Sequence, residues 1–248
     1  MLLYEIFNYI GVIALFIYNL SRIKNKKEFL GKLSLKIVEK AHEEKKKRGM
    51  MLFFAVIETL IISVFQYFPA VFLNSPFGDL VGTGANYFAT VYLSLLFLFA
   101  GSWILQIPWR QQIDLVAPGY PLALIFAKIG CLFGGCCGGF SASWGLYNRI
   151  SKSYEFPCQL VEAVVSLILF IFLHHLANRK RVKQGTLLPT YIILYSSIRF
   201  FTEFLRIEPN VLGIFKKYHF FCILGVLIGI FEYLMIVHHN IKSTSVTE

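Results

Sequence analysis

Long apolar stretches separated by short polar segments run through the whole sequence and predict its architecture. Each stretch is long enough, at about 1.5 Å per helical residue, to cross a hydrocarbon core roughly 30 Å thick. They cover residues 3–20, 50–73, 86–106, 114–136, 159–177, 186–205 and 218–237. The pattern therefore predicts an all-α polytopic membrane protein of about seven transmembrane helices, in a single integral membrane domain over residues 1–248.

Basic residues gather in alternate loops, and this bias predicts the orientation of the chain. The 22–48 loop holds the densest group and is predicted to be cytoplasmic, whereas the 74–85 loop has no lysine or arginine and is predicted to lie outside. The N-terminus then lies outside and the C-terminus inside. The first stretch has no basic leader or cleavage site, so we expect it to remain as a span.

Composition supports this assignment and narrows the partners. The chain is 56% hydrophobic and only 15% charged, which is too apolar for a soluble globule of this size. Its net charge of +10 could suggest nucleic-acid binding. Because the basic residues lie mainly between the spans, they are explained by membrane orientation, and no nucleic acid is expected as a partner.

One apolar stretch carries charged residues at helical spacing. Tyr195, Arg199 and Glu203 recur at intervals of four within 187–205, and Arg206 follows three residues later. This spacing places them on one face of a helix. An arginine and a carboxylate in hydrocarbon cost several kcal/mol unless they pair, line a polar cavity or bind a charged ligand. The face is therefore a candidate functional site.

Three predicted spans bring polar groups to the same depth. Lys128 and Arg199 each lie about 20 Å from the cytoplasmic end of their span, and Gln159 and Glu162 begin the span between them. The resulting layer holds three cations and two carboxylates, which suits an anionic head group such as a phosphate. The alternative is a set of buried ion pairs that lock helices together. Glu58, in another span, either pairs with Lys128 or is hydrogen-bonded while neutral.

A glycine- and cysteine-rich segment follows Lys128. Its five glycines argue against a plain helix and permit either backbone turns beside a ligand or close packing of helices. For Cys131, Cys136, Cys137 and Cys158 we expect small-residue packing first and a disulfide second. Their spacing matches no common zinc pattern, so no metal is expected.

Four motifs lie between residues 114 and 206. They read Asp114-Leu115-Val116-Ala117-Pro118 leading to Lys128-Ile129-Gly130, then Gly134-Gly135-Cys136-Cys137-Gly138-Gly139, then Pro157-Cys158-Gln159-Leu160-Val161-Glu162, and finally Tyr195-x-x-x-Arg199-Phe200-x-x-Glu203-x-x-Arg206. Together they resemble the motifs of the prolipoprotein diacylglyceryl transferase family, bacterial integral membrane enzymes with seven spans. The motif-bearing core is thus 114–206, and the last motif is the most specific.

The resemblance implies roles for individual residues. Catalytic roles fall on Arg199, Glu203, Lys128 and Tyr195, and substrate-binding roles on Arg206, Glu162, Gln159, Gly139 and Gly130. Arg199 would face a phosphate, Lys128 takes the place of a second essential arginine, and Gly139 that of a signature glycine. Where the family has a His-Gly-Gly motif, this chain reads Asn86-Tyr87-Phe88-Ala89-Thr90. Tyr195 or a carboxylate would then replace the histidine as base.

The resemblance also implies an activity. The chain is expected to transfer a diacylglyceryl group from phosphatidylglycerol, or another anionic phospholipid, to the lipobox cysteine of a preprolipoprotein signal peptide. It would do so without metal or organic cofactor, as a multi-pass protein of the bacterial cytoplasmic (inner) membrane with its site open to the outer leaflet. The alternatives are a transferase of the same fold with another acceptor and a non-catalytic lipid-binding paralogue.

Overall fold

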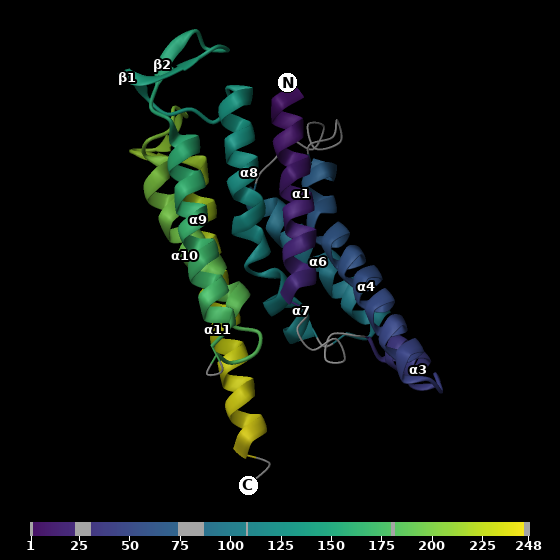
Figure 1. Ribbon diagram of the computed structural model, residues 1–248. Coiled ribbons are helices and arrows are strands. Elements are labelled where there is room, and N and C mark those ends of the chain that lie inside the picture. Colours follow the sequence, from purple (N-terminus) through teal and green to yellow (C-terminus); the bar gives the residue numbers. More distant parts are fainter. Residues whose placement is uncertain (1, 23–30, 74–86, 108, 180–181, 246–248) are drawn as a thin grey trace. The chain divides into compact units, whose positions relative to one another are not determined.

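The computed structural model describes residues 2–22, 31–73, 87–107, 109–179 and 182–245, and it is mainly helical. Residues 1–14 with 117–248 make one compact unit, and residues 15–116 make a second. We call these the motif unit and the N-terminal unit (Figure 1). The predicted external loop at 74–85 and parts of the predicted basic loop, residues 23–30, lie outside the described residues, as does Asn86.

The N-terminal unit contains the end of α1, from Leu15 onward, and four further helices. Their bounds are Leu2–Arg22 for α1, Lys32–Glu39 for α3, Glu44–Leu73 for α4, Tyr87–Leu105 for α6 and Trp109–Val116 for α7. Leu15, Ala55 and Leu98 are among its buried core residues. Asn19 donates a hydrogen bond to Ser63 at 3.2 Å, which ties α1 to α4 through buried amide and hydroxyl groups.

A buried carboxylate also organises the N-terminal unit. Glu58, on α4, accepts hydrogen bonds from the backbone N–H of Gly31 at 3.1 and 3.2 Å and from the Ser34 hydroxyl at 2.5 Å. Gly31 is the residue before α3, so the carboxylate satisfies an otherwise unpaired N–H at the start of that helix. Glu58 is thus hydrogen-bonded within its own unit, which is one of the two alternatives that the sequence left open.

The motif unit consists of the start of α1, four longer helices and two short β-hairpins. The helices are α8 (Gly119–Gly134), α9 (Cys158–Ala177), α10 (Leu187–Glu203) and α11 (Lys217–Ser245). The hairpins are β1 (Ser141–Asn148) with β2 (Ser153–Glu155), and β3 (Asn210–Leu212) with β4 (Phe215–Lys216), both antiparallel. The hairpin β1–β2 stands where α8 ends and α9 begins (Figure 1).

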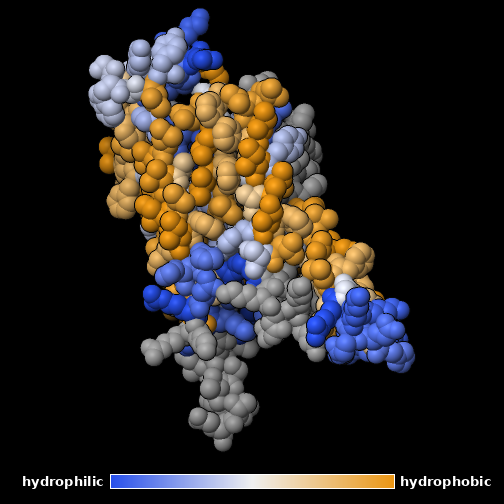
Figure 2. Space-filling model, in the orientation of Figure 1, coloured by the Kyte–Doolittle hydropathy of each residue, from blue (hydrophilic) through white to orange (hydrophobic). Residues whose placement is uncertain are grey.

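The surfaces of the helices and of the hairpin β1–β2 in the motif unit differ in hydropathy. The helical flanks in view are covered by hydrophobic side chains, whereas the hairpin β1–β2 is largely hydrophilic (Figure 2). On α9 the exposed side chains include Val164, Ile168 and Ile171. Exposed aliphatic residues along a helix whose opposite face is packed are expected where that helix contacts lipid.

Four segments are long and apolar enough to cross a membrane: Leu2–Arg22, Trp109–Gly134, Cys158–Ala177 and Lys217–His238, counted over the part of the chain that the structure describes. A shorter apolar helix covers Val91–Ile104. The helix α10 has 17 residues and ends at a charged residue. A membrane protein with several apolar helices is therefore supported, while the count of about seven and the orientation of the termini remain predictions.

The prediction of an all-α fold omitted the two hairpins. In β1 the sequence Ser-Ala-Ser-Trp-Gly-Leu-Tyr-Asn has no single buried face, since only Ala142 in it is fully buried. A strand without clear alternation of buried and exposed residues gives little signal in the sequence. The hairpins were missed for this reason.

Candidate functional site

A single carboxylate, Glu162 on α9, gathers three cations from other segments of the motif unit. Its Oε2 lies 2.6 Å from Nζ of Lys128 on α8, and its Oε1 lies 2.6 Å from a terminal nitrogen of Arg199 on α10. The same Oε1 accepts bonds from Arg206 at 2.6 Å and 3.1 Å. The structure thus brings together the polar groups whose common depth was inferred from the sequence.

A second carboxylate completes this charged cluster. Glu203 Oε2 lies 2.5 Å from the other terminal nitrogen of Arg199, so the guanidinium joins both carboxylates. Five residues therefore define the charged cluster: Lys128, Glu162, Arg199, Glu203 and Arg206. All are largely buried, with side-chain exposures between 0% and 11%. Three cations against two carboxylates leave an excess of positive charge in an apolar bundle, where an anion is the natural complement.

The position of Arg206 depends on backbone pairing beyond the helix. Because α10 ends at Glu203, helical spacing alone does not place Arg206, although the sequence predicts all four residues on one helix face. Arg206 instead forms an isolated antiparallel bridge with Gly139. The N–H of Phe140 donates to Leu205 O at 2.9 Å beside it. The segment after α8 thereby holds the segment after α10.

Gly139 permits this pairing because no side chain would fit there. A Cβ at this position would lie 2.7 Å from Cys158 Sγ and 2.8 Å from the carbonyl oxygens of Leu205 and Phe156. These distances are shorter than real Cβ contacts. In this structure the signature glycine therefore serves close backbone approach, which positions Arg206.

The remaining residues singled out in the sequence make other contacts within the motif unit. Gln159 donates to Cys136 O at 2.5 Å and so fixes the turn after α8. Tyr195 is buried on the same helix as Arg199, and its ring packs against Tyr191 with centroids 5.7 Å apart. Gly130 faces α1, where a Cβ would come within 3.2 Å of Tyr4 O, so its visible role is helix packing.

Two buried residues near the cluster gave no signal in the sequence. Lys216 donates from Nζ to Glu203 O at 2.9 Å and Phe204 O at 3.3 Å, and also to Arg206 O. These are carbonyls at and after the end of α10, which a cation satisfies well. His219 accepts from Lys216 N–H at 2.9 Å. The sequence gives no sign of these contacts, because nine residues separate Lys216 from Arg206 and the path of the chain between them is irregular.

The hairpin β1–β2 supports the turn from its other side. Asn148 donates from its amide to Gly135 O at 3.0 Å and to Glu155 at 2.9 Å. Burial raises the pKa of Glu155, but hydrogen bonds from Ser151, Asn148 and Ser153 lower it by a larger amount. The pKa of Glu155 therefore lies below its ordinary value. The ionised carboxylate is thus the form that the hairpin stabilises.

A cavity of about 300 Å³ lies beside this hairpin in the motif unit. Its walls combine the apolar Leu132, Phe133 and Leu146 with polar groups that include Asn148 and Gln159. Gln159 links the cavity to the turn that supports Arg206, whereas Lys128, Arg199 and Arg206 are not among its lining residues.

Comparisons with known proteins agree with the motif assignment. The sequence model of the prolipoprotein diacylglyceryl transferase family matches residues 2–235. The chain is 34% identical over 128 residues to phosphatidylglycerol–prolipoprotein diacylglyceryl transferase 2 of Clostridium perfringens, covering 48% of this chain and 50% of that protein. It is 30% identical over 132 residues to the Clostridium tetani transferase, covering 50% and 52%, and 34% identical over 141 residues to that of Campylobacter jejuni, covering 54% and 49%. These alignments span about half the length of the curated relatives.

Proposed function

The chain belongs to the prolipoprotein diacylglyceryl transferase family, and we propose that it transfers a diacylglyceryl group from phosphatidylglycerol to the lipobox cysteine of a preprolipoprotein. The relatives at 30–34% identity carry names that state this donor and acceptor class. The observation that carries the proposal is the excess of positive charge in the charged cluster, inside an apolar helical unit. We place the reaction at the outer leaflet of a bacterial cytoplasmic membrane.

The reaction requires a leaving phosphate to be stabilised and a thiol to lose its proton. The cysteine sulfur attacks the terminal glyceryl carbon, a C–S bond forms, the C–O bond to phosphate breaks, and glycerol phosphate departs with the electron pair. Arg199, Lys128 and Arg206 would hold the phosphate, since preorganised cations in a site with little water stabilise developing negative charge strongly. No metal or organic cofactor takes part in this step.

Of the two carboxylates, Glu203 is the better candidate for the base. Glu162 is engaged by three cations, so its negative charge already serves to orient them. Glu203 contacts Arg199 through Oε2, and its Oε1 has no hydrogen-bond donor among the described residues. That oxygen is free to accept the proton of the incoming thiol, with Tyr195 on the same helix as the other candidate.

A direct assay tests the proposal. Purified protein is incubated with phosphatidylglycerol and a lipobox peptide, and mass spectrometry follows the peptide cysteine. We expect a diacylglyceryl mass increase that requires the cysteine and falls by at least about 100-fold in Arg199→Ala. Substituting Glu232, which lies on α11 outside the motif core, with Gln gives a matched control that should retain activity.

Other outcomes would replace this proposal with one of its rivals. Every member of the charged cluster already has an ion-pair partner, which is also what a non-catalytic lipid-binding protein would show. Binding of phosphatidylglycerol vesicles without product would support that function. Product formed only with a different acceptor would support a transferase of the same fold with altered specificity.

A further inference from the structure

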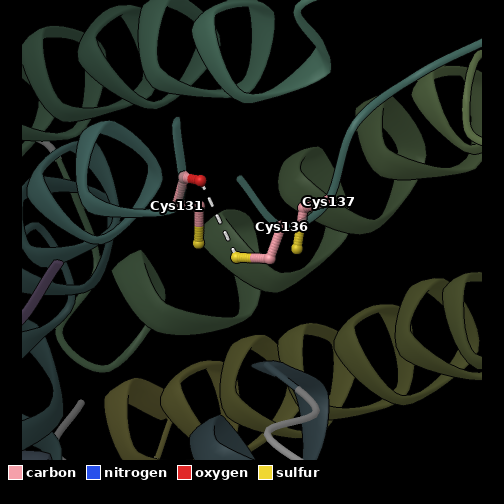
Figure 3. A group of neighbouring side chains, drawn as sticks. All are labelled: Cys131, Cys136 and Cys137. Carbon is pink, nitrogen blue, oxygen red and sulfur yellow. Dashed lines mark hydrogen bonds between the residues drawn. The ribbon is translucent and has the colours of Figure 1, made fainter. Parts of the chain in front are cut away.

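Three thiols converge at the end of α8, next to the charged cluster. Cys131 lies on the last turns of α8, while Cys136 and Cys137 lie in the turn that follows, and their sulfurs all lie within 4.8 Å of one another. Figure 3 shows the three side chains next to one another, with the sulfur of Cys136 between those of Cys131 and Cys137. The thiol of Cys136 also contacts Cys131 O at 3.8 Å. All three cysteines are free thiols, and Cys136 is exposed.

The spacing of the sulfurs suits a thiophilic metal ion. A Zn–S bond is about 2.3 Å long, so two sulfurs on a tetrahedral Zn²⁺ lie about 3.8 Å apart. Sulfurs within 4.8 Å of one another therefore need to move by at most about 1 Å to bind one ion together. A disulfide would use only two of the three and would require an S–S separation of about 2.05 Å.

The backbone of the turn is fixed by contacts from two other segments. Gln159 holds Cys136 O at 2.5 Å, and Asn148 holds Gly135 O at 3.0 Å. Cys137 has a φ of 64°, in the left-handed region that a non-glycine residue adopts only when its surroundings impose it. This conformation turns the chain so that the Cys137 thiol lies near that of Cys131, six residues earlier.

The electrostatic surroundings match a negatively charged metal complex. Three thiolates around a divalent ion carry a net charge of −1. Lys128 and Arg206 both lie near enough to Cys137 for their positive charges to act on its sulfur. Cations just outside the ligand shell stabilise a complex of net negative charge.

From this geometry we propose that Cys131, Cys136 and Cys137 form a binding site for one Zn²⁺ ion, with the fourth coordination position open to water. Binding releases three thiol protons and involves no oxidation. The ion would lock the turn that carries Gly139, and through the Gly139–Arg206 bridge it would stabilise the position of Arg206. Its role is structural, and the site stands independently of the transfer reaction proposed above.

Metal content measured on the full-length purified protein tests the site. The protein is reduced, stripped with a chelator, reloaded with Zn²⁺ and freed of excess metal, and its content is then measured by mass spectrometry. We expect about one Zn²⁺ per chain. Each of Cys131→Ser, Cys136→Ser and Cys137→Ser should weaken binding by more than the ~10- to 100-fold that loss of an outer-shell partner costs.

Cys222→Ala provides the matched control, because Cys222 is buried on α11 outside this cluster. It should bind Zn²⁺ as the wild type does. Substitution of Zn²⁺ by Co²⁺ gives a second readout on the wild-type chain, since thiolate ligands produce charge-transfer absorption. The proposal is wrong if reduced wild-type protein binds no stoichiometric metal, if all three serine variants bind normally, or if Co²⁺ binds without thiolate absorption.

Discussion

The two units of the chain each bury a glutamate on an apolar helix, and these two glutamates have different partners. Glu162 contacts Lys128, Arg199 and Arg206, all of them cations. Within the described residues, Glu58 accepts hydrogen bonds from the Gly31 N–H and the Ser34 hydroxyl, which carry no charge. Burial of a carboxylate is therefore not enough to indicate a functional site. The difference lies in whether the partners form a cluster with charge left over for a ligand.

The largest expected effect is that of Glu162→Gln, and Glu58→Gln is the matched comparison. Glu162→Gln leaves three buried cations without their common partner, a change that costs about 3–5 kcal/mol when a buried ion pair is broken. We expect loss of transferase activity and a marked drop in the unfolding temperature in detergent. Glu58→Gln should keep activity within about threefold and destabilise by about 1 kcal/mol, because an amide oxygen still accepts hydrogen bonds.

Both variants are measured by peptide lipidation and by thermal unfolding of the same preparations. If Glu58→Gln abolished lipidation while the protein stayed folded, the contrast between the two glutamates would be lost. Equal, small effects of the two substitutions would argue that the charged cluster is only a helix-locking device.

The next comparison exchanges the two kinds of cation within the cluster. Arg199 uses two nitrogens to reach Glu162 and Glu203, a fork that a single ammonium cannot reproduce. Lys128 makes one contact through Nζ. We therefore expect Arg199→Lys to lower kcat/KM by about 100-fold or more, and Lys128→Arg to leave it within about tenfold.

Initial rates over a range of phosphatidylglycerol concentrations measure this difference. The double variant that exchanges both cations keeps the total charge and serves as the control. Full activity in Arg199→Lys would show that the positive charge is sufficient and that the guanidinium geometry does not contribute to catalysis.

The sequence predicts features that follow from regular helices better than contacts made by irregular backbone. The expected span at 159–177 coincides closely with α9, Cys158–Ala177, because a long apolar run defines a helix. The convergence of Lys128, Glu162 and Arg199 followed from helix rise and alternating topology. Contacts that depend on the path of irregular backbone could not be read this way.

Lys216 and the three cysteines illustrate that limit. Lys216 reaches the end of α10 only because the hairpin β3–β4 folds the chain back. The cysteines meet because Gly135 and Cys137 both adopt positive φ, which linear spacing does not reveal. Pairing between the segments after α8 and α10 likewise became visible only in three dimensions. Tertiary contacts, and not local propensity, determine all of these positions.

A smaller effect is expected from Gly139→Ala. The added methyl would meet Cys158 Sγ at 2.7 Å and the Leu205 and Phe156 carbonyls at 2.8 Å. Overpacking of this kind costs about 1–3 kcal/mol, and here it would also displace Arg206. We expect lower thermal stability and lower activity together. Gly213→Ala tests the alternative of a general glycine effect, because no atom lies within 4 Å of a Cβ there, although its φ of 58° adds backbone strain.

The outcome to look for is the ratio of activity to stability. At Gly213 any loss should appear mainly in the unfolding temperature, since the added methyl would meet no atom within 4 Å. If Gly139→Ala unfolded at the wild-type temperature and retained full activity, close backbone approach would not be what positions Arg206.

The smallest effect concerns Glu155 and its dependence on pH. Its pKa in the folded protein lies below the ordinary value of 4.5, so the ionised carboxylate stabilises the hairpin at neutral pH. This contribution is present above the ordinary pKa and disappears as the pH falls through the lower, folded-state value. Although only 9% of Glu155 is exposed, it lies on a short hairpin at the surface, and we expect less than about 1 kcal/mol. Glu155→Gln should therefore lower the unfolding temperature slightly at neutral pH and converge with wild type in acid, whereas a constant difference at every pH would assign its effect to packing instead of charge.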